Sequence, residues 1–231
     1  MMETLDTYKE GKVLLIDKPL NWTSFQVVNK VRWLIKQQFS IKKIKVGHAG
    51  TLDPLATGLL ILCTGKFTKK IETYQAQVKE YTGTITLGAT TPSYDLESEI
   101  DQKFDISEIS EKDILKNTQQ FIGKIQQQPP IFSALKKNGK RLYEYAREGS
   151  KIDIPSRSVT IKEFQITKIE LPYIEFRIVC GKGTYIRSLA HDFGKSLNNG
   201  AHLSSLRRTK IGEFRVEDAI DVFEVEKFIK S

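Results

Sequence analysis

The segment Gly47-His48-Ala49-Gly50-Thr51-Leu52-Asp53-Pro54-Leu55-Ala56-Thr57-Gly58 decides how this chain is interpreted. Its three glycines permit backbone angles that other residues avoid, and a proline with a fixed φ follows its single acid. Asp53 is the only acidic residue between Asp17 and Glu72. The spacing leaves two interpretations open: a loop that holds one reactive carboxylate, or a tight turn in which Asp53 only accepts hydrogen bonds from nearby amides.

Further short motifs occur on both sides of this segment. They are Asp17-Lys18-Pro19 with Thr23-Ser24, Lys79-Glu80-Tyr81, Gln128-Pro129-Pro130-Ile131-Phe132-Ser133-Ala134-Leu135-Lys136, Gly183-Thr184-Tyr185-Ile186-Arg187 and Leu206-Arg207-Arg208. In this order, and with the segment above, they resemble the motifs of the TruB-type tRNA pseudouridine synthases. The resemblance runs from about Gly11 to about Phe214, which is nearly the whole chain.

The resemblance implies a fold and a reaction. The fold is α+β, with a mixed and mainly antiparallel central sheet, flanking helices and a basic RNA-clamping insertion. The reaction is the isomerisation of uridine to pseudouridine at position 55 in the T-loop of tRNA, with no metal and no cofactor. The bond from N1 of uracil to the sugar breaks, the base turns, and C5 bonds to the sugar. The target nucleotide has to flip out of the RNA, at a cost of roughly a few kcal/mol.

Matching motif positions imply roles for the catalytic residues. Asp53 is the nucleophile, because an ionised carboxylate needs no separate base; it attacks C1′ or assists formation of a glycal. Arg187 forks onto Asp53 and keeps it charged. Tyr81 stacks on uracil, and its hydroxyl serves in proton transfer. Without the resemblance, Arg187 would be an exposed helix arginine and Tyr81 a strand residue packed on the core.

Other positions are matched to the binding of uracil or of RNA. His48 occupies the space that the flipped nucleotide leaves, although a lone loop histidine is usually only a polar turn residue. Tyr185 and Leu206 line the uracil pocket, and Lys18 and Pro19 border it. The residues expected to hold phosphates are Arg207, Arg208, Lys136 and Arg141.

Composition limits the class of protein. A hydrophobic fraction of 39% with 12 Phe and 8 Tyr predicts a globular chain. Lysine and arginine number 36 against 28 acids, a formal charge of +8, which favours a polyanionic partner. The two cysteines are far apart without a CxxC pattern, and the histidines lack zinc spacing. The N-terminus has no apolar signal core, and no apolar run approaches the roughly 18 residues of a membrane span, which predicts the cytoplasm.

The segment from Gly123 to Arg157 differs in character from the rest. Residues 124–157 hold eight lysines and arginines against three acids, with Phe132, Tyr143 and Tyr145 between them. Charges for phosphates and rings for bases are typical of a nucleic-acid clamp. The alternative is a solvated amphipathic helix with its tyrosines packed inward. We expect this insertion to be loose without RNA and to become ordered on binding.

Periodicity predicts intermixed strands and helices. Thr23 and Gln26 fit a capping box, and the helix that follows to about Gln38 carries an apolar set. That set is Phe25, Val28, Val31, Trp33 and Ile35. The predicted strands are 12–17, 59–64, 81–87, 159–169, 173–180 and 203–214, and the other predicted helices are 68–75, 110–121, 184–197 and 222–229, with Thr184 as the cap of the third. Asn21 stands where many relatives have glycine, so it is expected to accept a left-handed turn.

Several chemistries lack their motifs here. The chain has no GxGxxG, no P-loop, no GxSxG elbow and no cluster of carboxylates for a metal-dependent nuclease. The chain has no internal repeat and no clear linker, which predicts one domain. With the resemblance, this implies one catalytic domain over 1–231 that includes the insertion at about 124–157, with no separate C-terminal RNA-binding domain. The expected partner is the T-arm of tRNA, for a monomer with no obligatory protein partner. The alternatives are a tRNA-binding folding chaperone with secondary catalysis and a guide-RNA-dependent pseudouridine synthase.

Overall fold

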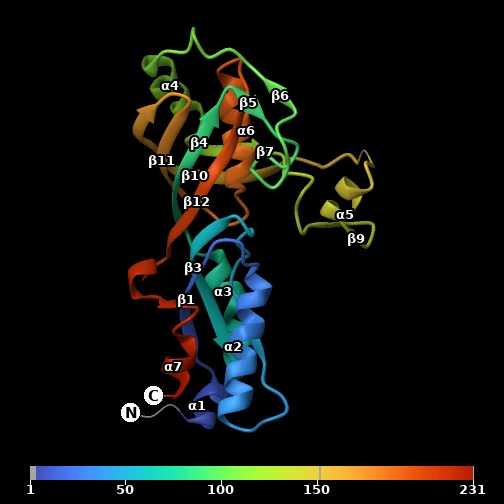
Figure 1. Ribbon diagram of the computed structural model, residues 1–231, viewed down its shortest axis with the longest axis vertical. Helices are drawn as coiled ribbons and strands as arrows, with labels where there is room; N and C mark the ends of the chain where they lie inside the picture. The colour runs from blue at the N-terminus through green and yellow to red at the C-terminus, as the bar shows by residue number, and fades with distance from the viewer. Residues whose placement is uncertain (1–3, 151, 231) are drawn as a thin grey trace. The chain divides into compact units, whose positions relative to one another are not determined.

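The computed structural model describes residues 4–150 and 152–230, which fall into two compact units (Figure 1). Unit 1 comprises the chain up to Tyr81 and the chain from Leu206 onward, and unit 2 comprises Thr82–Ser205. Two strands, β4 (Lys79–Leu87) and β12 (Ala201–Ile211), run from one unit into the other.

Unit 1 is built on a sheet with the strand order β14-β1-β3-β12. β1 pairs antiparallel with β3 and parallel with β14, and β3 pairs parallel with β12. β2 adds to β3 and β13 adds to β12, both antiparallel. The strand bounds are β1 (Val13–Lys18), β2 (Val46–His48), β3 (Ala56–Thr64), β13 (Phe214–Arg215) and β14 (Ile220–Asp221).

Alternate residues of β3 face two separate cores, as the period of a strand requires. Leu60 and Leu62 belong to the core that contains α2 (Ser24–Gln38) and α7 (Val225–Lys230). Ile61 and Cys63 belong to the other core, which contains residues of η1 (Gly65–Lys70) and α3 (Ile71–Ala76). β3 is therefore buried on both faces, which fits its continuous apolar sequence. The unit also contains α1 (Leu5–Glu10) and the 3-10 helix η3 (Val216–Asp218).

Unit 2 has the strand order β4-β11-β10-β7. The helix α6 (Ile186–Ser196) is amphipathic, and its Phe193 packs against Phe164 of β10, with ring centroids 5.4 Å apart. Short elements complete the unit. The bounds are β7 (Gly123–Gln127), β10 (Arg157–Glu170), β11 (Tyr173–Cys180), β5 (Ala89–Thr90), β6 (Gln102–Lys103), β8 (Lys136–Lys137), β9 (Lys140–Arg141), α4 (Glu111–Asn117), η2 (Thr118–Phe121) and α5 (Leu142–Arg147).

The architecture confirms the predicted α+β class. The pairs β1–β3, β2–β3, β10–β11, β10–β7 and β12–β13 are antiparallel, and β1–β14 and β3–β12 are parallel. The capping box of α2 is present, with the Gln26 backbone donating to Thr23 Oγ1 at 3.1 Å. Asn21 has φ 64°, the left-handed angle expected of it. No helix in the described part of the chain is long and apolar enough to cross a membrane.

Some local predictions are wrong. Phe25 and Trp33 on α2 are 62% and 53% exposed, because the buried stripe of that helix runs through Val27, Val31 and Leu34 and both aromatics fall outside it. Thr184 does not cap α6. The cap position is one residue later, and the Thr184 hydroxyl donates instead to the carbonyl of Gly181 at 3.1 Å.

Candidate active site

The loop that carries Asp53 is fixed on both sides. Ser24, in the first turn of α2, accepts from the Leu52 amide at 2.8 Å and donates to the Leu52 carbonyl at 3.0 Å. The Ala56 amide donates to the Asp53 carbonyl at 3.1 Å, which closes a turn before β3. Gly50 and Gly58 have φ 100° and 102°, angles that side chains with a Cβ rarely adopt. The half-buried Asp53 is thus presented by a loop with a defined backbone.

Lys18 is buried beside this loop. Its side chain is 0% exposed, and its ammonium donates to the carbonyls of Pro19 at 2.8 Å, Trp22 at 2.5 Å and Pro54 at 3.4 Å. Burial lowers the pKa of Lys18 to about 8, and the nearby charge of Asp53 opposes that change. Lys18 therefore joins the turn after β1 to the residue that follows Asp53, and Pro19 takes part through its carbonyl.

The two arginines of β12 differ in their surroundings. Arg207 forks onto Asp17, with Nη1 to Oδ1 at 3.1 Å and Nη2 to Oδ2 at 2.6 Å. Arg208 is 1% exposed, and its guanidinium donates to the carbonyls of Leu59 at 2.7 Å and Gly50 at 3.1 Å. This burial corrects the phosphate-binding role expected for Arg208, since its donors are aimed at backbone carbonyls inside the unit. Arg207 is partly exposed and already holds a carboxylate.

The remaining candidates of unit 1 lie on strands. His48 ends β2 and is half-buried; burial lowers its pKa, and the charge of Arg208 lowers it further, so the imidazole is neutral at pH 7. Tyr81 lies on β4 and is buried. Leu206 pairs with Ala56, three residues after Asp53, and is partly buried. Parallel pairing of β3 with β12 therefore places the Leu206-Arg207-Arg208 motif beside the strand that follows the Asp53 loop.

Arg187 lies in unit 2, on the first turn of α6, and is 3% exposed. Its Nη1 donates to the Ser93 carbonyl at 3.2 Å and lies 3.6 Å from Asp95 Oδ2, and its Nη2 donates to the Phe132 carbonyl at 2.9 Å. The interpretation as an exposed helix arginine is therefore wrong. Sequence analysis missed Asp95, a buried acid in a turn-rich acidic stretch; the signal was a serine two residues before it, which donates to its carboxylate at 2.6 Å.

Tyr185 is held at the same end of α6. Gln127 of β7 bonds both of its backbone groups, accepting from the amide at 2.8 Å and donating to the carbonyl at 3.0 Å. The guanidinium of Arg157 lies 4.8 Å from the centroid of its ring. Gln127 was also missed, and only its place directly before the Gln128-Pro129-Pro130 motif could have pointed to it.

The insertion presents its cations on a small hairpin. Lys136 pairs with Arg141, and both side chains are exposed. Asn138 and Gly139 turn the chain between them with φ 53° and 79°, as the dipeptide predicts. The Arg141 guanidinium lies 5.9 Å from the centroid of the Tyr143 ring. Basic and aromatic groups therefore share this surface, while loosening and ordering on RNA stay predictions.

The candidate residues divide between the two units. Unit 1 contains Lys18, Pro19, His48, Asp53, Tyr81, Leu206, Arg207 and Arg208, and unit 2 contains Lys136, Arg141, Tyr185 and Arg187. Within unit 1, Lys18 and Arg208 hold the loop around one half-buried carboxylate. Among residues 4–150 and 152–230, no group of three or more His, Cys, Asp and Glu side chains is arranged to hold a metal ion.

Comparison with known proteins places the chain in a family. Residues 36–186 match the model of the TruB family pseudouridylate synthase N-terminal domain, and residues 187–230 match that of the tRNA pseudouridylate synthase B C-terminal domain. The tRNA pseudouridine synthase B of Flavobacterium johnsoniae is 63% identical over 220 residues, 95% of this chain and 96% of that protein. Its counterpart in Phocaeicola vulgatus is 54% identical over 215 residues, 93% of this chain and 92% of that protein.

Solved structures share the fold of this chain. The crystal structure of a Cbf5-Nop10-Gar1 complex contains a chain that is 29% identical, with a TM-score of 0.70. The match covers 98% of this chain and 56% of that one, so the protein spans about half the length of that relative. An H/ACA RNP bound to a substrate RNA gives 26% identity and a TM-score of 0.69. From its motifs, its fold and these matches, the chain belongs to the TruB family of pseudouridylate synthases.

Proposed function

We propose that this protein isomerises uridine to pseudouridine in tRNA, at position 55 of the T-loop, with Asp53 as the nucleophile. The observation that carries the proposal is the identity of 63% to a tRNA pseudouridine synthase B over 95% of the chain. The geometry agrees with it, because the loop of Asp53 is fixed by Ser24, Lys18 and Arg208 and so presents one carboxylate. We further propose a cytoplasmic monomer that needs no protein partner.

The reaction keeps every atom of the nucleoside. The Asp53 carboxylate attacks C1′ as the bond from C1′ to N1 breaks, or it assists loss of a sugar proton that gives a glycal. The electron pair of the broken bond stays on the uracil, which turns within the pocket. C5 then bonds to C1′ as the bond from C1′ to the Asp53 oxygen breaks or, on the glycal route, as the sugar regains the proton it lost. The proton then leaves C5, and N1 gains a proton. Both routes require the carboxylate to be held at the sugar, which the fixed loop supplies.

The surrounding residues have separate tasks in this proposal. Tyr81 stacks on the flipped uracil, and its hydroxyl serves in proton transfer, while His48 fills the space left in the RNA. Leu206 and Tyr185 line the uracil pocket. Arg187 keeps the carboxylate of Asp53 ionised, a task for which the hydrogen bonds from its guanidinium to two backbone carbonyls of unit 2 fix the guanidinium plane.

RNA affinity is assigned to exposed cations. Lys136 and Arg141 in the insertion contact phosphates, and Arg207 on β12 contributes from unit 1, where its side chain is 41% exposed. Arg208, whose guanidinium is bonded to the carbonyls of Leu59 and Gly50, is proposed to position the Asp53 loop. We treat 1–231 as one catalytic domain in which the insertion, 124–157, moves on RNA binding.

The test is Asp53→Asn, with pseudouridine formation and tRNA binding measured on the same preparation. Asparagine keeps the shape of the side chain and removes its charge, so product formation is expected to fall below detection while the dissociation constant for tRNA changes less than about threefold. Retained turnover would remove Asp53 from the chemistry. If Asp53→Asn lost tRNA binding together with turnover, the assignment of roles would be contradicted. If the wild-type protein restored the folding of tRNA but formed no pseudouridine, the chaperone alternative would be favoured.

A further inference from the structure

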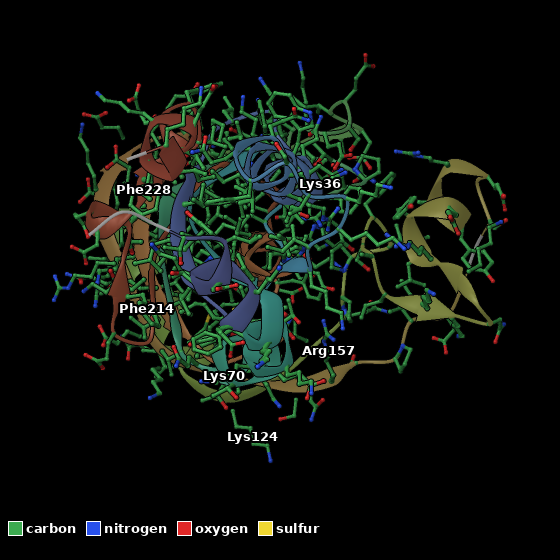
Figure 2. All side chains as sticks on the ribbon, turned by 90° about the horizontal axis from the view of Figure 1, so that it is seen from below. Lys36, Lys70, Lys124, Arg157, Phe214 and Phe228 are labelled. Atoms are coloured by element: carbon green, nitrogen blue, oxygen red, sulfur yellow. The ribbon has the colours of Figure 1, made fainter. Side chains whose placement is uncertain are left out.

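Unit 1 contains a strongly basic pocket that the proposed mechanism does not use. Its volume is about 700 Å³, and it lies where α1, the end of α2, the loop after α2 and η1 meet. Figure 1 shows α1 and the loop after α2 at the same end of this unit, and Figure 2 labels Lys36 on α2. We call it the Lys42 pocket. Its lining is Lys9, Arg32, Lys36, Lys42, Lys43, Ile44, Lys45, Gly65, Lys66, Thr68 and Lys69.

The lining is unusual in its charge. Eight of the eleven residues are lysine or arginine, and none is acidic. Lys66 pairs with Glu10, and Arg32 donates to Asn29 and to the Val46 carbonyl. Within residues 4–150 and 152–230, the side chains of Lys9, Lys36, Lys42, Lys43, Lys45 and Lys69 make no ion pair or hydrogen bond. Like charges this close repel one another within the roughly 8 Å screening length of physiological salt, so a bound polyanion stabilises the arrangement.

The kinds of side chain indicate which polyanion fits. Seven of the eight cations are lysines, which act as point charges for phosphates and do not read bases through a planar fork. Ile44 is the only large apolar residue of the lining, and no aromatic ring lines the pocket on which a nucleobase could stack. The pocket therefore suits a sugar–phosphate backbone and does not suit a free nucleotide.

The position of the pocket indicates which part of an RNA it would contact. The helix α2 leads from Ser24, which holds the Asp53 loop, to Lys36, which lines the pocket. Twelve residues of α-helix separate Ser24 from Lys36, a length of about 18 Å at 1.5 Å per residue. At the other side, Lys45 leads through β2 into the Asp53 loop. Both sites are thus rigidly connected within one unit, and an RNA that reaches both must extend well beyond the flipped nucleotide.

We propose that the Lys42 pocket binds backbone phosphates in the paired stem of the RNA substrate, at the end of α2 that lies about 18 Å along the helix from Ser24, the residue that holds the Asp53 loop. This rests on the proposed function, because it takes the substrate to be a stem-loop RNA. The pocket fixes how far along the stem the protein reaches. It contributes affinity without reading sequence, and its contribution falls as salt rises.

The test uses charge reversal and two RNAs. The variant is Lys42→Glu with Lys43→Glu, both exposed side chains, and the matched control is Lys112→Glu with Lys116→Glu on α4, which changes the net charge equally. Binding is measured by fluorescence anisotropy with a full tRNA transcript and with a stem-loop cut down to its loop and closing base pairs. Because binding is measured without turnover, failure of this proposal can be distinguished from failure of the proposed function, which Asp53→Asn tests.

For the full transcript, the dissociation constant of the Lys42/Lys43 variant is expected to rise at least about tenfold at ~0.1 M salt. The slope of log K against log salt is expected to fall by about 1.5 to 2, the loss of two phosphate contacts. Binding of the short RNA is expected to stay within about twofold, and the control to match the wild type. Unchanged binding of the transcript would overturn the proposal and leave an acidic protein as the ligand to consider. Equal weakening for both RNAs, or for the control, would reduce the effect to net charge and also overturn it.

Should the double reversal fail to give folded protein by circular dichroism, Lys42→Ala with Lys43→Ala provides the same comparison. Both lysines are exposed and make no side-chain hydrogen bond in the described chain, so their truncation leaves the fold intact. The expected changes are smaller, about threefold to tenfold in the dissociation constant of the transcript, and the same outcomes decide the proposal.

Discussion

Replacing Gly58 with alanine tests how the Asp53 loop is joined to the sheet. Gly58 lies on β3 between two paired strands that each carry a motif of the family. It pairs with Lys18 on β1 and with Arg208 on β12. A Cβ at this position would lie 2.3 Å from the carbonyl oxygen and 2.8 Å from the nitrogen of Arg208. Both atoms belong to the backbone, so no side-chain rotation can relieve the contact, and β12 has to move away from β3.

Gly50→Ala is a matched control in the same unit. The two glycines have nearly the same φ, 100° for Gly50 and 102° for Gly58. A Cβ at Gly50 would meet only the Arg208 side chain, at an ordinary 3.6 Å. The strain of the backbone angle, about 1–3 kcal/mol, is therefore common to both variants. The change in unfolded-chain entropy is common as well, so the difference between the variants isolates the steric clash.

The clash adds about 1–3 kcal/mol, the usual cost of overpacking a dense interior. Parallel hydrogen bonds between β3 and β12 weaken as well, at about 1 kcal/mol each. We expect Gly58→Ala to destabilise unit 1 by about 3–5 kcal/mol and Gly50→Ala by about 1–3 kcal/mol. A loss of the first size removes a large share of the stability of an ordinary domain, about 5–15 kcal/mol.

Urea unfolding followed by tryptophan fluorescence measures the difference. The chain has only two tryptophans, Trp22 and Trp33, and both lie in unit 1, so the signal reports that unit. The expected result is a lower midpoint for Gly58→Ala than for Gly50→Ala at a similar slope. Equal midpoints for the two variants would refute the reasoning that close contact of β3 with β12 excludes a side chain at position 58.

Three further outcomes are expected. Arg187→Lys should lower turnover by at least about a hundredfold with little change in tRNA binding, because one ammonium cannot bridge the Ser93 and Phe132 carbonyls and a carboxylate together; near-wild-type turnover would remove Arg187 from the site. The pKa of Lys18 lies at about 8 in the folded unit against an ordinary value of 10.5, so between these pH values the unfolded chain binds more protons and unit 1 gains stability with rising pH, by up to about 3 kcal/mol. Lys18→Met should flatten that part of the curve of unfolding free energy against pH, and an unchanged slope would assign it to other groups. A chelator should leave pseudouridine formation unchanged, whereas a requirement for added metal would contradict the cofactor-free mechanism.

Local chemistry explains the predictions that held. The capping box at Thr23 and Gln26, the left-handed turn at Asn21 and the antiparallel pair β10–β11 all depend on residues close in sequence. Each has a signature that propensity and spacing reveal directly. The motifs and their order along the chain indicated the family, and the matched relatives confirmed it.

Long-range packing explains what was missed or wrong. Arg208 was predicted to contact a phosphate. It is instead buried and donates to the carbonyls of Leu59 and Gly50, because β12 pairs parallel with β3. Phe25 and Trp33 were predicted to pack in the core with the rest of α2, but the buried face of the helix contains Val27, Val31 and Leu34, and both aromatics are exposed. No pattern within one segment distinguishes these outcomes.

The sequence by itself determined the family, the α+β class and the residues that carry the proposed chemistry, because motif identity and hydrophobic period are properties of the chain. Only the tertiary structure decided that Lys18 and Arg208 are internal supports of the Asp53 loop, and that lysines from α1, α2 and η1 share one pocket. The physical reason is that burial and local charge depend on neighbours brought together by strand pairing and helix packing, which lie far apart along the chain.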